Sequence, residues 1–170
     1  MKVIGIDPGS NVTGYGILER DERQIRHVDS GIIAPRAGML LPERLSLIYR
    51  EISSLIERHE PEILAIEDLF VAKNARSSLI LGHARGVAIL AACLAGLPVS
   101  EYAPSQVKQA VVGTGRADKY QVQLMVKAIL RLPEVACEDA SDALAVAICH
   151  LNSSVLAGMI DRKQKSGGTR

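Results

Sequence analysis

The sequence predicts an α/β fold built on a mixed, five-stranded sheet with helices on both faces. Three extended segments without a helix between them open the chain, which predicts a meander of antiparallel strands. From about residue 42 the apolar residues take helical spacing, and two more short apolar strands follow, each after a helix. Strand–helix–strand connections place strands parallel, so the sheet should be antiparallel on one side and parallel on the other.

The opening meander is predicted at residues 3–7, 14–18 and 24–33. The first strand is apolar and ends in Asp7, after which Pro8 and Gly9 turn the chain. A charged turn is expected at residues 19–23, between the second and third strands.

The rest of the chain alternates helices with two strands. A helix is predicted between Pro42 and Pro61, and Ser77 or Ser78 is expected to cap the next one. The elements expected after the first helix are a strand over 63–66, a helix over 77–96, a strand over 99–102, helices over 104–112 and 122–129, and a last helix through residue 151.

Length and composition favour a single domain in the cytoplasm. Of the 170 residues 48% are hydrophobic, so residues 1–158 are expected to form one domain and residues 159–170 a disordered polar tail. The three cysteines form no C-x-x-C pair, which favours reduced thiols in a cytoplasmic protein. Asp7 interrupts the start of the chain before a signal peptide could form, and no uninterrupted apolar run approaches membrane-spanning length. No association with a membrane is expected.

Charge is distributed unevenly along a chain whose formal net charge is only +1. Residues 1–69 hold 8 basic and 12 acidic residues, whereas residues 70–132 hold 8 basic and 2 acidic residues, a net charge of +6. A basic middle segment suits an anionic polymer held by one part of the surface. A chance excess of basic residues on solvated helix faces explains the charge equally well.

The helix expected over 77–96 is apolar nearly all round. Beyond its first turn, only His83 and Arg85 interrupt the apolar character. A helix of this kind is buried on more than one side, and Gly82 and Gly86 would let another backbone approach closely. The second buried face indicates either a partner subunit or burial between the sheet and a neighbouring helix of the same chain.

Four acidic side chains are expected to meet at one edge of the sheet. Asp7 ends the first strand and Glu67 ends the fourth, so both would emerge where such sheets bind ligands, provided that these strands are parallel neighbours. Asp139 and Asp142 are three residues apart and share one face of the last helix. Glu138, four residues before Asp142, fits the spacing as well and stays an alternative.

Carboxylates that converge without a Lys or Arg between them repel one another unless cations neutralise them. Hard divalent ions such as Mg²⁺ prefer oxygen ligands, and two of them about 3.5–4 Å apart can support phosphodiester cleavage by activated water. Acids in the first turn of a helix also stabilise the helix dipole, but this does not explain the acids that end two strands. The four histidines do not pair with cysteines at the spacing of zinc ligands.

Several short motifs follow one another along the chain. They are I-D-P-G-S from Ile6, G-Y-G from Gly14, L-A-I-E from Leu64, F-V-A-K-N from Phe70, G-H-A-R-G from Gly82, Q-V-K-Q from Gln106 and D-A-S-D-A-L-A from Asp139. Together they cover nearly the whole chain, and their order resembles that of the RuvC family of bacterial Holliday-junction resolvases, the crossover junction endodeoxyribonucleases.

The resemblance implies a ribonuclease H-like fold, a homodimer, and Mg²⁺-dependent, symmetric nicking of four-way DNA junctions in recombination and repair. It implies two Mg²⁺ ions per active site with substrate, with Mn²⁺ as a substitute, and co-operation with the RuvA–RuvB branch-migration motor. The family's acidic tetrad, catalytic and metal-binding, falls on Asp7, Glu67, Asp139 and Asp142. The third of these acids varies in the family between Asp and His.

The resemblance also implies residues that bind DNA. The family's phosphate-handling lysines fall on Lys108 and Lys119, and its junction-probing aromatic residue falls on Phe70. From the residues alone Phe70 would be expected in a core, whereas the resemblance favours an exposed ring that stacks on a displaced base. The basic middle segment adds further candidates for phosphate contact, in loops or at helix starts: Lys73, Arg76 and Arg116.

Two other functions compete with that of a junction resolvase. Sugar kinases and actin-like ATP-binding proteins also open with an Asp-x-Gly strand and a hairpin, but they need a second phosphate loop in a second lobe. This chain is too short for such a lobe. A junction-binding protein that does not cleave is the other alternative, and the presence of all four acids argues against it.

Overall fold

Five strands form one mixed sheet in the order β3-β2-β1-β4-β5. The computed structural model describes residues 1–21, 24–68 and 75–166, the stretch 155–166 as backbone only. The central strand β1 (Lys2–Asp7) is antiparallel to β2 (Thr13–Asp21), which is antiparallel to the edge strand β3 (Gln24–Ile33). On its other side β1 is parallel to β4 (Ile63–Glu67), which is parallel to β5 (Val99–Tyr102). The mixed sheet predicted from the sequence is confirmed.

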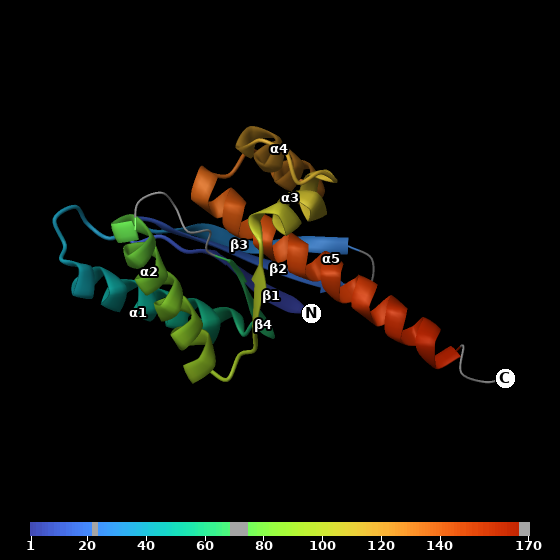
Figure 1. The fold of residues 1–170 in the computed structure, drawn as a ribbon, viewed down its shortest axis with the longest axis horizontal. Helices are drawn as coiled ribbons and strands as arrows, with labels where there is room; N and C mark the ends of the chain where they lie inside the picture. Colours follow the sequence, from blue (N-terminus) through green and yellow to red (C-terminus); the bar gives the residue numbers. More distant parts are fainter. Residues whose placement is uncertain (22–23, 69–74, 167–170) are drawn as a thin grey trace.

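Helices cover both faces of this sheet (Figure 1). One face carries α1 (Leu41–His59) and α2 (Ala75–Leu94). The other carries α3 (Pro104–Val112), α4 (Lys119–Leu130) and α5 (Glu138–Ser166), and α5 continues well past the sheet towards the C-terminus.

The two layers have separate apolar cores because successive residues of a strand face opposite ways. In β1, Ile4 and Ile6 pack into the core under α1 and α2, whereas Val3 packs into the core under α3, α4 and α5. All three side chains are fully buried. From Val3 to Ile6 the central strand therefore carries no polar side chain on either face, and it then ends in Asp7.

The first turns of α5 lie directly on the sheet because β1 and β2 carry glycines beneath them. A Cβ atom at Gly14 would lie 1.9 Å from the carbonyl oxygen of Asp139, and one at Gly5 would lie 2.2 Å from that of Ala143. Either distance is far below van der Waals contact. The glycines thus set how closely the helix that carries Asp139 and Asp142 approaches the end of β1.

The end of β2 and the start of α2 differ from the boundaries expected. β2 continues through Asp21, although a charged turn was expected from residue 19, because Glu19 and Arg26 pair across the β2–β3 ladder and form an ion pair. Helix α2 begins at Ala75, before both serines that were expected to cap it. Alanine and arginine favour helix, so the two residues before Ser77 join its first turn.

The last helix is longer than the sequence suggested. Residues 159–170 were expected to form a disordered polar tail, but α5 continues as a helix to Ser166. Residues 159–166 contain neither proline nor glycine, so nothing in their backbone chemistry ends the helix before Gly167. Residues 167–170 lie outside the described residues.

Helix α2 has one side that the other described residues leave exposed. Four alanines along it are buried: Ala84, Ala88, Ala91 and Ala92. Leu79, Leu90 and Leu94, on another side, are 66%, 50% and 67% exposed. By length and composition α2 is also the one helix of the described residues that could cross a membrane, a test that core helices of soluble proteins pass as well.

Candidate active site

Asp7 and Glu67 end neighbouring parallel strands. Ile6 lies opposite Ile66 in the β1–β4 register, so the carboxylates that follow leave the sheet at the same edge. Arg85 of α2 donates a hydrogen bond from Nε to the carbonyl oxygen of Glu67, at 3.2 Å, and so holds the end of β4 in place. The edge predicted from the strand pattern is the one at which these two side chains meet.

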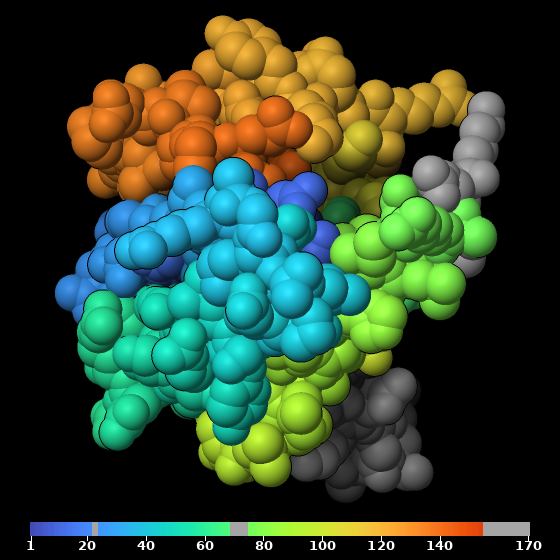
Figure 2. Space-filling model, turned by 90° about the vertical axis from the view of Figure 1, so that its left-hand side faces the viewer, coloured from blue at the N-terminus to red at the C-terminus, as the bar shows by residue number. Residues whose placement is uncertain are grey.

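Helix α5 brings further acids to this edge. Asp142 lines a cavity of about 270 Å³ together with Asp7 and Glu67. Asp139 lies in the first turn of α5. It is not in the cavity wall, but it is near enough for its charge to raise the pKa of Asp7. Figure 2 looks onto this edge and shows a hollow between the gold and orange layer of α3 to α5 and the cyan and green layer of α1 and α2.

The loop after Asp7 is held by hydrogen bonds. The hydroxyl of the buried Thr13 donates to the carbonyl oxygen of Gly9 at 2.6 Å and accepts from the Gly9 amide at 3.3 Å. Farther along the loop, the Arg44 guanidinium donates to the side-chain oxygen of Asn11 at 2.5 Å. The Pro8–Gly9 turn predicted after β1 is thereby tied to β2 and to α1.

The three carboxylates that line the cavity all have raised pKa values. Burial, followed by the charges of Asp142, Glu67 and Asp139, raises the pKa of Asp7 to about 7. The pKa values of Glu67 and Asp142 are also raised, in each case mainly by burial. Such a cluster needs either protons or cations to neutralise it.

Two lysines complete the wall of the cavity, Lys108 from α3 and Lys119 from the first turn of α4. The Lys119 ammonium forms ion pairs with Glu138 and, at 3.5 Å, with Asp142. The hydrogen bond to Glu138 is the main reason why the pKa of Lys119 is raised. Both lysines lower the pKa of Glu67 by their charge.

The donor set suits a divalent cation, although the ligands are not gathered around one point. Within the described residues, no three His, Cys, Asp or Glu side chains are close enough together to hold a metal ion. Carboxylates without a cation between them repel one another, and Lys119 forms an ion pair with Asp142. Carboxylate oxygens around a small cavity, with one pKa near 7, nevertheless fit a hard cation, because its charge would relieve the repulsion.

The other predicted DNA-binding residues do not line the cavity. Arg116 is exposed in the loop that precedes α4, and Arg76 is exposed in the first turn of α2. Phe70 and Lys73 lie outside the described residues, so their predicted roles stay predictions.

Sequence reasoning missed how Arg85 supports the site. Besides its bond to the Glu67 backbone, Arg85 forms ion pairs with Glu101 and, at 3.6 Å, with Asp68. Its side chain is only 15% exposed. A buried arginine needs partners, so a lone arginine in the middle of an otherwise apolar helix was the signal that could have revealed it.

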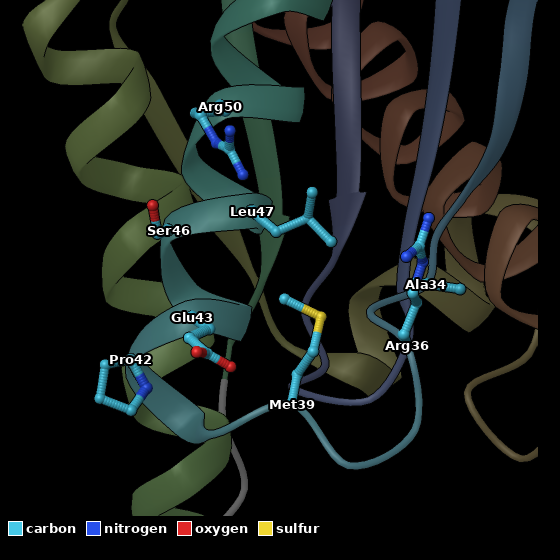
Figure 3. Close-up of a pocket in the computed structure, with 8 residues that line it drawn as sticks. All are labelled: Ala34, Arg36, Met39, Pro42, Glu43, Ser46, Leu47 and Arg50. Atoms are coloured by element: carbon cyan, nitrogen blue, oxygen red, sulfur yellow. The ribbon is translucent and has the colours of Figure 1, made fainter.

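A larger cavity lies apart from Asp7, Glu67 and Asp142, between α1 and the segment that precedes it (Figure 3). Its volume is about 800 Å³, and its wall includes Arg36, Met39, Leu47 and Arg50. None of the predicted site residues lines it, so its size does not make it the better candidate for the active site.

Comparison with known proteins identifies the family. The family model described as "Crossover junction endodeoxyribonuclease RuvC" matches residues 3–150. The chain belongs to the RuvC family. The RuvC of Geotalea uraniireducens is 53% identical over 169 residues, 99% of either chain, and that of Citrifermentans bemidjiense is 58% identical over 154 residues, 91% of this chain and 94% of the relative.

Solved RuvC structures share the fold. Thermus thermophilus RuvC in complex with a Holliday junction substrate has a TM-score of 0.87 at 33% identity, over 92% of this chain and 96% of that one. Another structure of Thermus thermophilus RuvC has a TM-score of 0.83 at the same identity. The fold is therefore ribonuclease H-like, as predicted, and RuvC membership replaces the sugar-kinase and actin-like alternative.

Proposed function

We propose that this protein is a structure-selective endonuclease that resolves four-way (Holliday) DNA junctions by paired, symmetric nicks in homologous recombination and DNA repair. The observation that carries the proposal is the meeting of Asp7, Glu67 and Asp142 with two lysines in one cavity. The relatives named crossover junction endodeoxyribonucleases cover almost the full chain.

The reaction we propose is hydrolysis of a phosphodiester with the help of Mg²⁺. Asp7, Glu67, Asp139 and Asp142 would hold two Mg²⁺ ions, or Mn²⁺ in their place, which supply an activated water and neutralise the leaving oxygen. Asp7 must lose its proton to act as a ligand, and its pKa of about 7 makes this loss possible at neutral pH. Lys108 and Lys119, which line the same cavity, would bind the phosphate oxygens.

The DNA surface would extend from the cavity along the basic middle segment. Arg116 and Arg76 are exposed and lie outside the cavity wall, and exposed arginines suit contacts with phosphates of the junction arms. We assign Lys73 and Phe70 to the same surface from the family resemblance alone. The co-operation with RuvA and RuvB proposed here also rests on that resemblance.

A homodimer would place two such cavities on one junction. The exposed leucines of α2 form one stripe with Gly86, where a Cβ atom would have none of the described residues beyond the neighbouring turns of α2 within 4 Å. An apolar stripe with an open glycine suits close packing against the same helix of a second copy. The two-fold axis of such a dimer matches the two equivalent strands of a four-way junction.

We place the protein in the cytoplasm, with no membrane association. The apolar side of α2 suits packing against a second copy of the chain better than insertion into lipid. Arg85 lies in the middle of the helix and bonds to β4 and β5, and a charged residue there would be costly in a membrane. The proposal agrees with the reduced cysteines expected from the sequence.

A nicking assay on a synthetic four-way junction with Mg²⁺ tests the proposal. Asp7→Asn, Glu67→Gln and Asp142→Asn should each abolish nicking and leave junction binding largely intact, because each removes a ligand charge but none of the basic surface. Asp139→Asn should also be severe. Glu134→Gln, which removes one exposed carboxylate from the loop before α5, serves as the control and should cut at the parental rate.

Two results would count against this assignment. Cleavage near the parental rate by any of the three ligand variants would remove that residue from the site. A larger loss with Glu138→Gln than with Asp139→Asn would mean that the other register of α5 supplies the ligand.

A further inference from the structure

Lys119 lies between two carboxylates with different surroundings. Its ammonium contacts Glu138 more closely than Asp142, whose oxygen lies 3.5 Å away. Asp142 lines the cavity and its side chain is 26% exposed, whereas the Glu138 side chain is 57% exposed and is not in the cavity wall. The lysine is thus held from the outer rim of the cavity by a residue that faces solvent.

The position of Lys119 affects Asp142 directly. An ammonium bonded to the Asp142 carboxylate would occupy an oxygen that a cation needs and would add a positive charge where the cation must bind. Glu138 competes with Asp142 for the same ammonium, so it draws that charge outwards. The lysine nevertheless stays in the wall of the cavity, where a phosphate can reach it.

We propose that Glu138 is a positioning residue: by holding the Lys119 ammonium at the rim of the cavity, it weakens the ion pair between Lys119 and Asp142 and makes the Asp142 carboxylate more available to a divalent cation. The proposal rests on the metal site proposed above, and it assigns to Glu138 a role that differs from that of a ligand. Glu138 acts through Lys119, so its effect must disappear when Lys119 is absent.

Calorimetric titration of the DNA-free protein with Mg²⁺ tests this dependence. Glu138→Gln should weaken Mg²⁺ binding about two- to five-fold, the range expected for an exposed ion pair, because Lys119 then turns fully to Asp142. Lys119→Ala should bind Mg²⁺ at least as tightly as the parent. Adding Glu138→Gln to Lys119→Ala should change the affinity no further.

Two controls separate positioning from a general loss of charge. Glu134→Gln removes the same charge from the loop that precedes α5, and among the described contacts Glu134 forms no ion pair with Lys119, so it should leave the affinity unchanged. Glu138→Asp keeps the carboxylate and should recover at least half of the lost affinity. In cleavage assays, Glu138→Gln should raise the Mg²⁺ concentration needed for half-maximal rate and leave the rate at saturating Mg²⁺ nearly parental.

The possible failures are distinguishable. An unchanged Mg²⁺ affinity in Glu138→Gln, or the same loss with and without Lys119, would overturn the positioning role and leave the metal site standing. A parental protein that binds no Mg²⁺ in the presence of junction DNA would overturn the metal site itself, and the positioning role with it.

Discussion

Asp7 occupies the least favourable position for a charge among the acids of the cavity. An unfolded carboxyl loses its proton near pH 3.8, whereas folded Asp7 keeps it to about pH 7 because of burial and of three neighbouring acids. Folding therefore takes up a proton between these values. The free energy of unfolding contributed by this residue falls as the pH rises through that window and stays low above it.

Replacing Asp7 should consequently stabilise the metal-free protein while it destroys activity. With a chelator present at pH 8, Asp7→Asn should be more stable than the parent by about 2 kcal/mol. This is half of the free energy that the raised pKa of Asp7 implies, because the site is partly open to solvent. The advantage should shrink by about half at pH 5, where folded Asp7 is protonated. Thermal unfolding at both pH values measures the difference, and a variant less stable than the parent at pH 8 would contradict it.

Gly14 should tolerate no side chain. A Cβ atom there would meet the carbonyl oxygen of Asp139 at 1.9 Å, so Gly14→Ala must push the start of α5 away from the sheet. We expect a loss of about 1–3 kcal/mol in stability and a larger proportional loss in nicking, because Asp139 and Asp142 move with the helix. Gly86→Ala, where a Cβ has open space, is the matched control for stability. Parental activity in Gly14→Ala would show that the distance between α5 and the sheet is not critical for cleavage.

At the scale of whole elements, the sequence predicted the strands better than the packing of α5. The order and pairing of β1 and β4 followed from apolar runs that each end in an acid, which is a local signal. The docking of α5 depends on Gly5 and Gly14, whose meaning appears only when the opposite element is known. Glycines in strands often mark such close approach, but the sequence does not indicate which element approaches them.

Helix α2 offers a test of the dimer. Gly86→Leu should leave the protein folded, because none of the described residues outside the neighbouring turns of α2 has an atom within 4 Å of a Cβ at that position, but it should block close packing of a second copy. We expect a shift towards monomer in sedimentation and single nicks or none in a cruciform-plasmid assay. Ser46→Leu, which adds the same side chain to an exposed position of α1, should remain dimeric. A dimeric Gly86→Leu that makes two coordinated nicks would place the interface elsewhere.

At the scale of the whole molecule, the distribution of charge separates binding from chemistry. The basic middle segment supplies both lysines of the cavity wall, whereas the acids come from the segments on either side. Charge counts along the sequence predicted this division. They could not predict that Lys119 would contact Asp142, because that contact depends on where α4 packs against α5.

Junction affinity should accordingly fall steeply as the salt concentration rises, because lysines and arginines that bind phosphates release counterions from the DNA. Lys108→Ala should lower the salt slope by about one and should reduce cleavage more than binding, since Lys108 lines the cavity rather than the open surface. Binding measured by fluorescence anisotropy at several salt concentrations, with nicking rates on the same junction, tests both statements. Arg116→Ala, on an exposed loop, should instead reduce binding and cleavage alike. An affinity that does not depend on salt would contradict the electrostatic basis of binding.

The sheet face that receives α5 has a consequence for protein synthesis. Asp7 is synthesised long before Asp139 and Asp142, which come from α5, the helix that lies on that face over Gly5 and Gly14. A nascent chain that ends before α5 can pair its strands, but it has half of the acids and a bare apolar surface. On the site proposed above, the acids are therefore brought together only after α5 has been synthesised, so a nascent chain that stops before Glu138 should not nick DNA.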